Sequence, residues 1–198
     1  MTTIQALAFA SFTFANSITP GPNNTMLLAS GANYGFARTV PHIAGITAGC
    51  IVMLLLVGFG LGQFFAAFPV IYDVLRDVGA AYLLWMAWKI ARASPPSADR
   101  AEGRPMTFLQ AAVFQWVNPK AWIIVISAVT AYTNHAGFGN DVITLAVILS
   151  LVMTPSIGVW AGCGTVLKPI LLHPGRIRAF NMAMALLLVL SLLPMFAM

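Results

Sequence analysis

The chain has 198 residues, of which 8% are charged and 60% are hydrophobic, and its mean hydropathy is +0.87. Because soluble domains carry about 25% charged residues, this composition excludes an ordinary soluble fold and predicts an integral membrane protein. The ten lysines and arginines outnumber the five acidic residues. They are scattered between apolar segments, which argues against nucleic acid as a partner and in favour of membrane lipid.

Six apolar segments come close to or exceed the roughly 20 residues that a helix needs to cross a bilayer. They cover about residues 4–32, 40–65, 71–91, 107–133, 142–167 and 179–196. Between the third and the fourth lies the long polar segment 92–106, whose prolines and charges predict a loop. We therefore predict an all-α integral membrane protein with six transmembrane helices in a single domain that covers residues 1–198.

The first segment, 4–32, is longer than a straight crossing requires, and Pro20-Gly21-Pro22-Asn23-Asn24 interrupts it near its centre. Proline removes a backbone donor and clashes with the preceding turn, so this motif frees carbonyl groups that hydrocarbon cannot satisfy. Such backbone is tolerated where it lines a cavity. Either Thr19 or Gly21 can cap a new half-helix that starts at the prolines.

The fourth segment, 107–133, carries a second interruption, Asn118-Pro119-Lys120. Lys120 is the only ionised side chain between Arg104 and Asp141, and a charge inside a membrane span indicates a functional site by default. Asn118 can cap a half-helix and Pro119 can occupy its first position. The free amide groups at the start of that half-helix would attract an anion.

The two halves of the chain resemble each other. Each begins with a broken segment, continues with a segment that ends in glycines and closes with a segment rich in Ala and Leu. Because each half holds three segments, halves that share a fold must insert in opposite directions, as in many secondary transporters. We predict two inverted three-helix repeats, about 1–91 and 107–198, with broken helices 1 and 4 and with the cytoplasmic loop 92–106 between the repeats.

The basic residues predict the orientation. With the N-terminus outside, only Arg76 lies in an outward-facing connection. The inward-facing connections then hold Arg38, Lys89, Arg92, Arg100, Arg104, Lys168, Arg176 and Arg178. Short cytoplasmic loops carry an excess of Lys and Arg, so we expect both termini on the periplasmic or extracellular side.

We expect the two interruptions to face each other near mid-membrane and to form the substrate site. Two positive helix ends and Lys120 suit a carboxylate, while carbonyl and amide oxygens suit an ammonium group, so the site fits a zwitterionic amino acid. Transport is expected to proceed by alternating access, as one half rocks against the other. The candidate substrate-binding residues are Pro20, Gly21, Pro22, Asn23, Asn24, Gln115, Asn118, Pro119 and Lys120.

Motifs along the whole chain resemble those of the LysE/RhtB family of amino-acid exporters. They are Thr19-Pro20-Gly21-Pro22-Asn23-Asn24, Gly35-Phe36-Ala37-Arg38, Ala44-Gly45-Ile46-Thr47-Ala48-Gly49, Gly79-Ala80-Ala81-Tyr82-Leu83-Leu84-Trp85 and Asn118-Pro119-Lys120. The Pro-Gly-Pro-Asn-Asn form and Trp85-Met86-Ala87-Trp88-Lys89-Ile90 are similar to the cysteine and O-acetylserine exporter branch. The resemblance implies that small neutral amino acids or derivatives, of this type or of the threonine and homoserine type, are exported across the bacterial inner membrane. It also implies coupling to the proton gradient. We expect no cofactor.

The proton carrier is not evident from the sequence. Some members of that family carry an acidic residue in the fifth segment, where this chain has Val152-Met153-Thr154-Pro155-Ser156. Lys120 can itself release a proton once it is removed from water, and Asp73, Asp77 and Asp141 could act at the outer mouth. Lys120 and Asp73 are the candidates for proton coupling.

Two other functions stay open at this point. A heavy-metal cation exporter of the same superfamily would need soft ligands, and Cys50, Cys163 and the scattered methionines make a poor set. A membrane-embedded enzyme would need a nucleophile or an acid-base pair, which the apolar segments do not offer. The glycine pairs Gly45/Gly49 and Gly158/Gly162 predict close helix packing, within the chain or in a homodimer.

Overall fold

A computed structural model of the chain describes residues 1–61, 69–92, 104–133 and 137–192. All regular structure in these ranges is helical, and no strand occurs among them. The elements are α1 (Thr3–Ile18), α2 (Pro22–Tyr34), α3 (Phe36–Leu56), the π-helical η1 (Val57–Leu61), α5 (Pro69–Ala91), α6 (Phe108–Phe114), the 3₁₀ turn η2 (Gln115–Val117), α7 (Pro119–Tyr132), α8 (Phe138–Leu167), the 3₁₀ turn η4 (Ile170–Leu172) and α9 (Pro174–Leu190). The prediction of an all-α fold is confirmed for the described residues.

Helices occupy all six segments that the sequence predicts to be apolar spans. Phe36–Gly60 and Phe138–Leu167 are long and apolar enough to cross a membrane as single helices. The pair Phe108–Val117 and Pro119–Tyr132 meets the same criterion together, with a bend of 73° between its two parts. By length and composition alone, the described residues therefore hold two or three candidate spans.

Local sequence determines where several helices start and end. The helices that open the two broken segments, α1 and α6, both begin with a capping box, in which Thr2 pairs with Gln5 and Thr107 pairs with Gln110. Gly35 separates α2 from α3 with φ 85°, a left-handed conformation that favours glycine. The chain thus reverses sharply after α2 and starts α3 one residue later.

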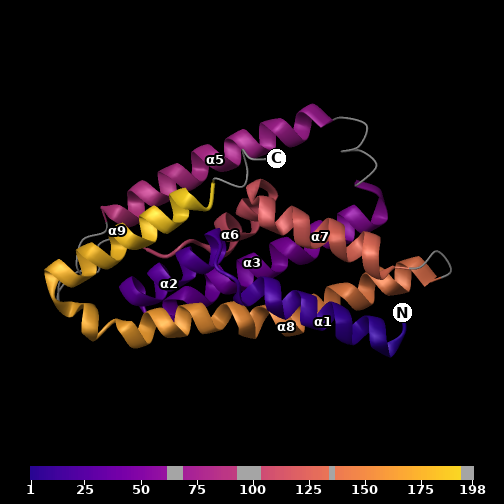
Figure 1. Ribbon diagram of the computed structural model, residues 1–198, viewed down its shortest axis with the longest axis horizontal. Helices are drawn as coiled ribbons and strands as arrows, with labels where there is room; N and C mark the ends of the chain where they lie inside the picture. The colour runs from indigo at the N-terminus through magenta and orange to yellow at the C-terminus, as the bar shows by residue number, and fades with distance from the viewer. Residues whose placement is uncertain (62–68, 93–103, 134–136, 193–198) are drawn as a thin grey trace.

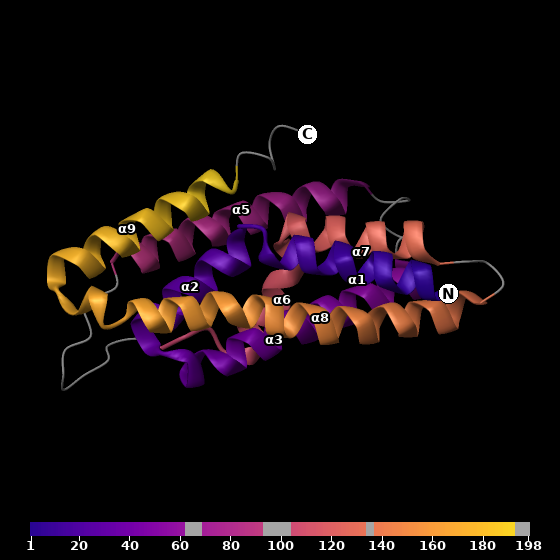
Figure 2. The same ribbon diagram turned by 60° about the horizontal axis from the view of Figure 1, so that its bottom comes forward.

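The helices form an elongated bundle around α3 and α8. In Figures 1 and 2, α2 lies against α8, while α5 and α9 run side by side along one flank. Helix α1 also packs on α8, and α6 packs on α3. The two long helices touch directly, and the hydroxyl groups of Thr47 and Thr154 lie 3.0 Å apart across their contact.

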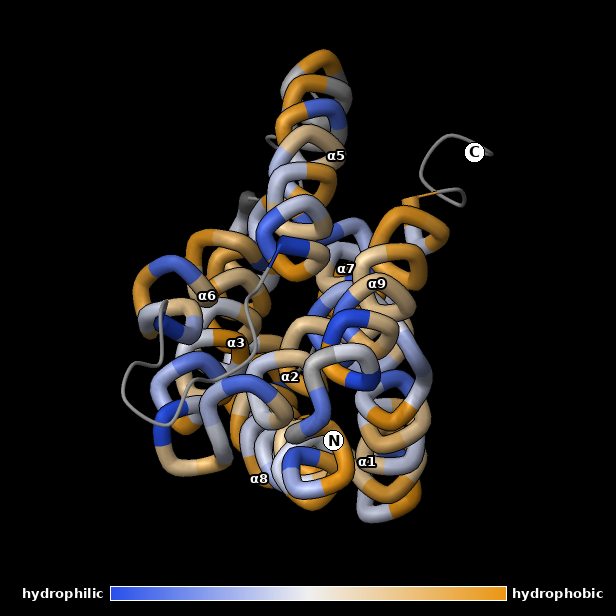
Figure 3. Tube along the Cα trace, turned by 90° about the vertical axis from the view of Figure 1, so that its left-hand side faces the viewer, coloured by the Kyte–Doolittle hydropathy of each residue, from blue (hydrophilic) through white to orange (hydrophobic). Residues whose placement is uncertain are grey.

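The bundle is apolar outside as well as inside. Leu27, Met53 and Leu145 are fully buried in its core, yet Leu151 and Val166 on α8 are 70% and 74% exposed. Apolar residues also occur around the perimeter in the end-on view of Figure 3. Soluble monomers rarely expose apolar surface on this scale, so the outer faces indicate contact with lipid.

The predicted glycine contacts hold for one pair and fail for the other. A Cβ atom on Gly45 or Gly49 would overlap backbone or side-chain atoms of α6 or η2, so α3 approaches them closely, as predicted. For Gly158 and Gly162 the prediction of close packing within the chain is wrong, because a Cβ atom on either would meet no atom of the described residues within 4 Å, and packing in a homodimer stays a prediction. The close approach on α8 is made by Gly164, which faces the backbone of α2.

Candidate functional site

The two helix breaks meet in space although they lie far apart in the sequence. The side-chain amides of Asn23 and Gln115 exchange two hydrogen bonds, with Asn23 Nδ2 2.8 Å from Gln115 Oε1 and Gln115 Nε2 3.2 Å from Asn23 Oδ1. Lys120 Nζ donates to the carbonyl oxygen of Thr19 at 2.8 Å. The residues that the sequence singles out at each break are thus brought together by the fold.

A cavity of about 30 Å³ lies between the breaks. The predicted residues that line it are Gly21, Pro22, Asn23, Asn24, Asn118 and Lys120. Gln115 reaches this group through its hydrogen bonds with Asn23. Pro20 lies in the break itself, and Pro119 is the first residue of α7. A cavity of this size holds about one or two water molecules, so an amino acid requires the breaks to separate.

The first break presents one satisfied helix end and one open helix end. At the end of α1, Asn24 Nδ2 donates to the carbonyl oxygens of Ser17 at 2.7 Å and Thr19 at 2.8 Å. Helix α2 starts at Pro22, its N-cap is Gly21, and no side chain caps its first turn. Of the two predicted caps, Gly21 therefore takes that position, while Thr19 is the C-cap of α1.

The second break is shorter, because a single residue, Asn118, separates η2 from α7. Its side-chain oxygen accepts from the backbone N–H of Lys120 at 3.2 Å, and Pro119 occupies the first helical position, as the sequence predicts. Asn118 Nδ2 also donates to Gln115 Oε1 at 3.2 Å. This helix start therefore carries its own cap.

Gln115 joins the two breaks from a fully buried position. Besides its bonds with Asn23 and Asn118, its Nε2 donates to the Ala111 carbonyl oxygen at 2.9 Å. The Cys50 thiol lies 3.7 Å from its Oε1. Because a buried amide without partners is costly, this network fixes the relative position of α2, α3 and α7.

Lys120 points its charge at the end of α1. The Thr19 carbonyl that accepts from it belongs to the C-terminal, negative end of that helix, where a cation is favoured. An ammonium group has three donors, and this bond uses one of them. Gly21 leaves room for this side chain, since a Cβ atom there would stand 3.2 Å from Lys120 Cδ and would crowd it.

Sequence reasoning missed some residues of this site. Ser17 and Cys50 line the cavity, and the Ser17 hydroxyl is buried without a hydrogen-bond partner among the described residues. Ser17 has a weak signal in the sequence, since it directly precedes the first break. Cys50 has none, because only the packing of α3 brings it to Gln115.

The acidic candidates lie away from the cavity or outside the described part of the chain. Asp141 is buried at the start of α8, where its Oδ1 accepts from the amino group of Met1 at 2.5 Å. The side chain of Asp73 falls outside the described residues. Cys50 is buried and Cys163 is exposed, and the described residues hold no group of three or more His, Cys, Asp or Glu side chains suited to a metal ion.

Apolar outer faces and two helix breaks that meet at a small cavity define a helical membrane protein of the transporter class. The family model described as "LysE type translocator" matches residues 14–193, so the chain belongs to this family.

The chain is 35% identical to the cysteine/O-acetylserine efflux protein of Salmonella typhimurium over 191 residues, which covers 96% of each chain. It is 31% identical to the protein of the same name from Escherichia coli K12, again over 96% of both. No solved structure matches the chain.

Proposed function

We propose that this protein exports small neutral amino acids or their derivatives, of the cysteine and O-acetylserine type, across the bacterial inner membrane. The observation that carries this function is the meeting of the two breaks, through the Asn23–Gln115 and Lys120–Thr19 hydrogen bonds. The cysteine/O-acetylserine efflux proteins with 31–35% identity to the chain support this substrate class.

The proposed site can bind a zwitterion. The uncapped start of α2 and the two remaining donors of Lys120 suit a carboxylate. The side-chain oxygens of Asn23, Gln115 and Asn118 suit an ammonium group. Pro20, Gly21, Pro22, Asn24 and Pro119 form the backbone on which these groups are held. Because the cavity is too small for an amino acid, the substrate must enter as the breaks part, which is the basis of alternating access.

The proposed architecture is six transmembrane helices in two inverted repeats, residues 1–91 and 107–198, joined by the cytoplasmic loop 92–106. Three observations support it. Each broken segment opens with the same Thr-x-x-Gln capping box, the opening helix of each half packs on the long helix of the other, and the closing helices α5 and α9 pack together.

The proposed orientation places both termini outside the cytoplasm. The α2–α3 junction, the C-terminal end of α5 and the α8–α9 junction lie at one end of the bundle, opposite the start of α1 (Figure 1). These segments contain Arg38, Lys89, Arg92, Lys168, Arg176 and Arg178. An end so rich in basic residues is expected on the cytoplasmic side.

We further propose that export is coupled to protons. Lys120 is the candidate carrier within the cavity, and Asp73 is the candidate that the sequence suggests near the outer mouth. Membrane lipid is the proposed neighbour of the outer faces, and a homodimer stays a prediction.

Growth rescue tests the function. Sensitive cells that express the chain would be challenged in parallel with cysteine, O-acetylserine, threonine, homoserine or cadmium. We expect protection against cysteine and O-acetylserine, and lower intracellular levels of the protective compound. Protection against cadmium alone would contradict the proposal, as would a membrane-inserted protein that protects against none of them.

A further inference from the structure

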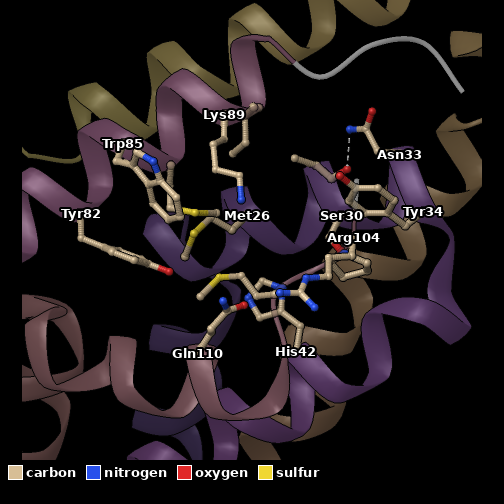
Figure 4. A pocket seen from close by; sticks show the side chains of 15 residues that line it. Met26, Ser30, Asn33, Tyr34, His42, Tyr82, Trp85, Lys89, Arg104 and Gln110 are labelled. Atoms are coloured by element: carbon tan, nitrogen blue, oxygen red, sulfur yellow. Dashed lines mark hydrogen bonds between the residues drawn. The ribbon is translucent and has the colours of Figure 1, made fainter. Parts of the chain in front are cut away.

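A second, larger cavity of about 130 Å³ lies between α2, α3, α5 and α6. Figure 4 shows its walls: Met26, Ser30 and Asn33 from α2, Tyr82, Trp85 and Lys89 from α5, His42 from α3, Gln110 from α6 and Arg104 from the segment before α6. This cavity is large enough for several water molecules or one small polar ligand.

The cavity is positively charged at its rim. Lys89 and Arg104 are both exposed and line it from opposite sides. Lys89 Nζ lies 4.6 Å from the centre of the Trp85 ring, a cation–π contact that holds the amine over the cavity. The described lining residues include no Asp or Glu. The rim therefore favours an anion.

The His42 ring lies deeper in the cavity than the two cations and lacks a hydrogen-bond partner among the described residues. It is 1% exposed, and within the described part of the chain neither ring nitrogen makes a hydrogen bond. A buried polar group without a partner costs about 1–3 kcal/mol, and such groups call for a ligand or an ordered water. The ring lines the same cavity as the two cations.

The two cavities share the faces of two helices. On α2, Met26 of the large cavity follows Asn23 of the small cavity by three residues. On α3, His42 precedes Ile46, which lines the small cavity, by four residues. Residues three or four apart lie on one face of a helix, one turn from each other. The large cavity is thus one helical turn from the breaks, on the side of the basic end.

We propose that the large cavity is a second substrate site, where Arg104, Lys89 and His42 hold the carboxylate of an amino acid before it reaches the helix breaks. This inference rests on the proposed function, since it takes the ligand to be the exported amino acid. The cations at the rim attract the carboxylate, and His42 donates to it from below. Movement by one helical turn along α2 then brings the ligand to Asn23.

Equilibrium binding of radiolabelled O-acetylserine to the full chain in lipid nanodiscs tests this inference. We expect two equivalents per chain in the unaltered protein. Arg104→Gln and His42→Phe should each lower the affinity of the large cavity for O-acetylserine by about tenfold or more. This corresponds to the loss of one charge-assisted hydrogen bond. Lys120→Met should remove the other equivalent and leave the large cavity occupied.

Arg178→Gln is the matched control, because Arg178 is an exposed cation of α9 that does not line the cavity. O-acetylserine amide, which lacks the carboxylate, should bind without sensitivity to Arg104→Gln. If the unaltered protein binds one equivalent of O-acetylserine and Lys120→Met binds none, the second site is overturned, while the proposed function is unaffected. Full binding by both Arg104→Gln and His42→Phe would also overturn it and would mean that the cavity holds water. If the unaltered protein binds no O-acetylserine and cells gain no protection, the proposed function fails together with the inference.

Discussion

The two helix breaks differ in how the free backbone groups at their helix ends are hydrogen-bonded. At the second break, Asn118 caps α7 with its own side chain, so the helix start needs nothing from outside. At the first break, Gly21 leaves the start of α2 uncapped, while Asn24 and Lys120 satisfy the end of α1. In the proposed transport cycle, the first break would offer backbone donors to the substrate, while the second would hold its own helix start fixed.

Lys120→Met should have the largest effect on efflux, because Lys120 belongs to the second break and contacts the first. The change removes the cation and leaves the Thr19 carbonyl without this donor. We expect the efflux rate from proteoliposomes to fall by about 100-fold, the upper range for a charged hydrogen bond.

Lys168→Met, at the end of α8, is the control for a lost lysine charge and should transport normally. If Lys120→Met shows proton-dependent efflux at the normal rate, Lys120 has no part in the mechanism. The Lys120–Thr19 hydrogen bond would then be unimportant for transport.

Gln115→Leu should come next, because it removes the Asn23–Gln115 link between the breaks and leaves the Lys120–Thr19 link in place. The side-chain amides of Asn23, which is partly buried, and Asn118, which is buried, each lose a partner. A loss of about 2 kcal/mol of stability is expected, together with slower efflux, and thermal unfolding in detergent measures the stability change.

Gln115→Glu keeps the acceptor oxygens and loses the donors to Asn23 and Ala111. Its stability should therefore lie between that of the unaltered protein and that of Gln115→Leu. Equal stability of all three proteins would show that the network does not hold the breaks together.

Gly21→Ser should place a side-chain cap on the start of α2, which has none in the unaltered protein. Its φ of −178° is extended backbone that serine can adopt, and its hydroxyl can cap α2 as Asn118 caps α7. We expect substrate affinity to fall by about tenfold, because the cap competes with the substrate carboxylate.

Gly21→Ala serves as the partner variant, since its Cβ crowds Lys120 equally but cannot cap. Gly158→Ala controls for glycine replacement in general, because its Cβ meets open space. If Gly21→Ser and Gly21→Ala bind substrate equally, the open end of α2 is not the carboxylate site.

Asn118→Ser should have the smallest effect, since serine caps a helix nearly as well as asparagine and only the bond from Nδ2 to Gln115 is lost. Asn118→Ala loses that bond and the cap as well, so it should cost about 1 kcal/mol of stability more than Asn118→Ser. Denaturation curves of the two variants separate the cap from the network, and equal curves would contradict a capping role for Asn118.

The sequence predicted the breaks well because proline acts locally. Pro22 and Pro119 each occupy the first position of a helix whatever surrounds them. The partners across the breaks depend on tertiary packing, so the bond from Lys120 to Thr19 and the place of Cys50 could not be predicted. The glycine spacing illustrates the same limit, since Gly45 faces α6 while Gly158 faces open space.

The close contact between α2 and α8 bears on which parts of the molecule can move as units. A Cβ atom on Gly31 would overlap the Ala161 carbonyl, and one on Gly164 would overlap the Leu28 carbonyl, so the two backbones touch at two levels. Helix α6 is held to α3 in the same way by Gly45 and Gly49. Rocking the first half of the chain against the second would have to part both interfaces. If α2 and α8 slide as one unit past a second unit of α3 and α6, both interfaces stay intact. Each of these units combines a helix from each half of the chain. The Asn23–Gln115 hydrogen bonds would then hold the two units together in the closed arrangement.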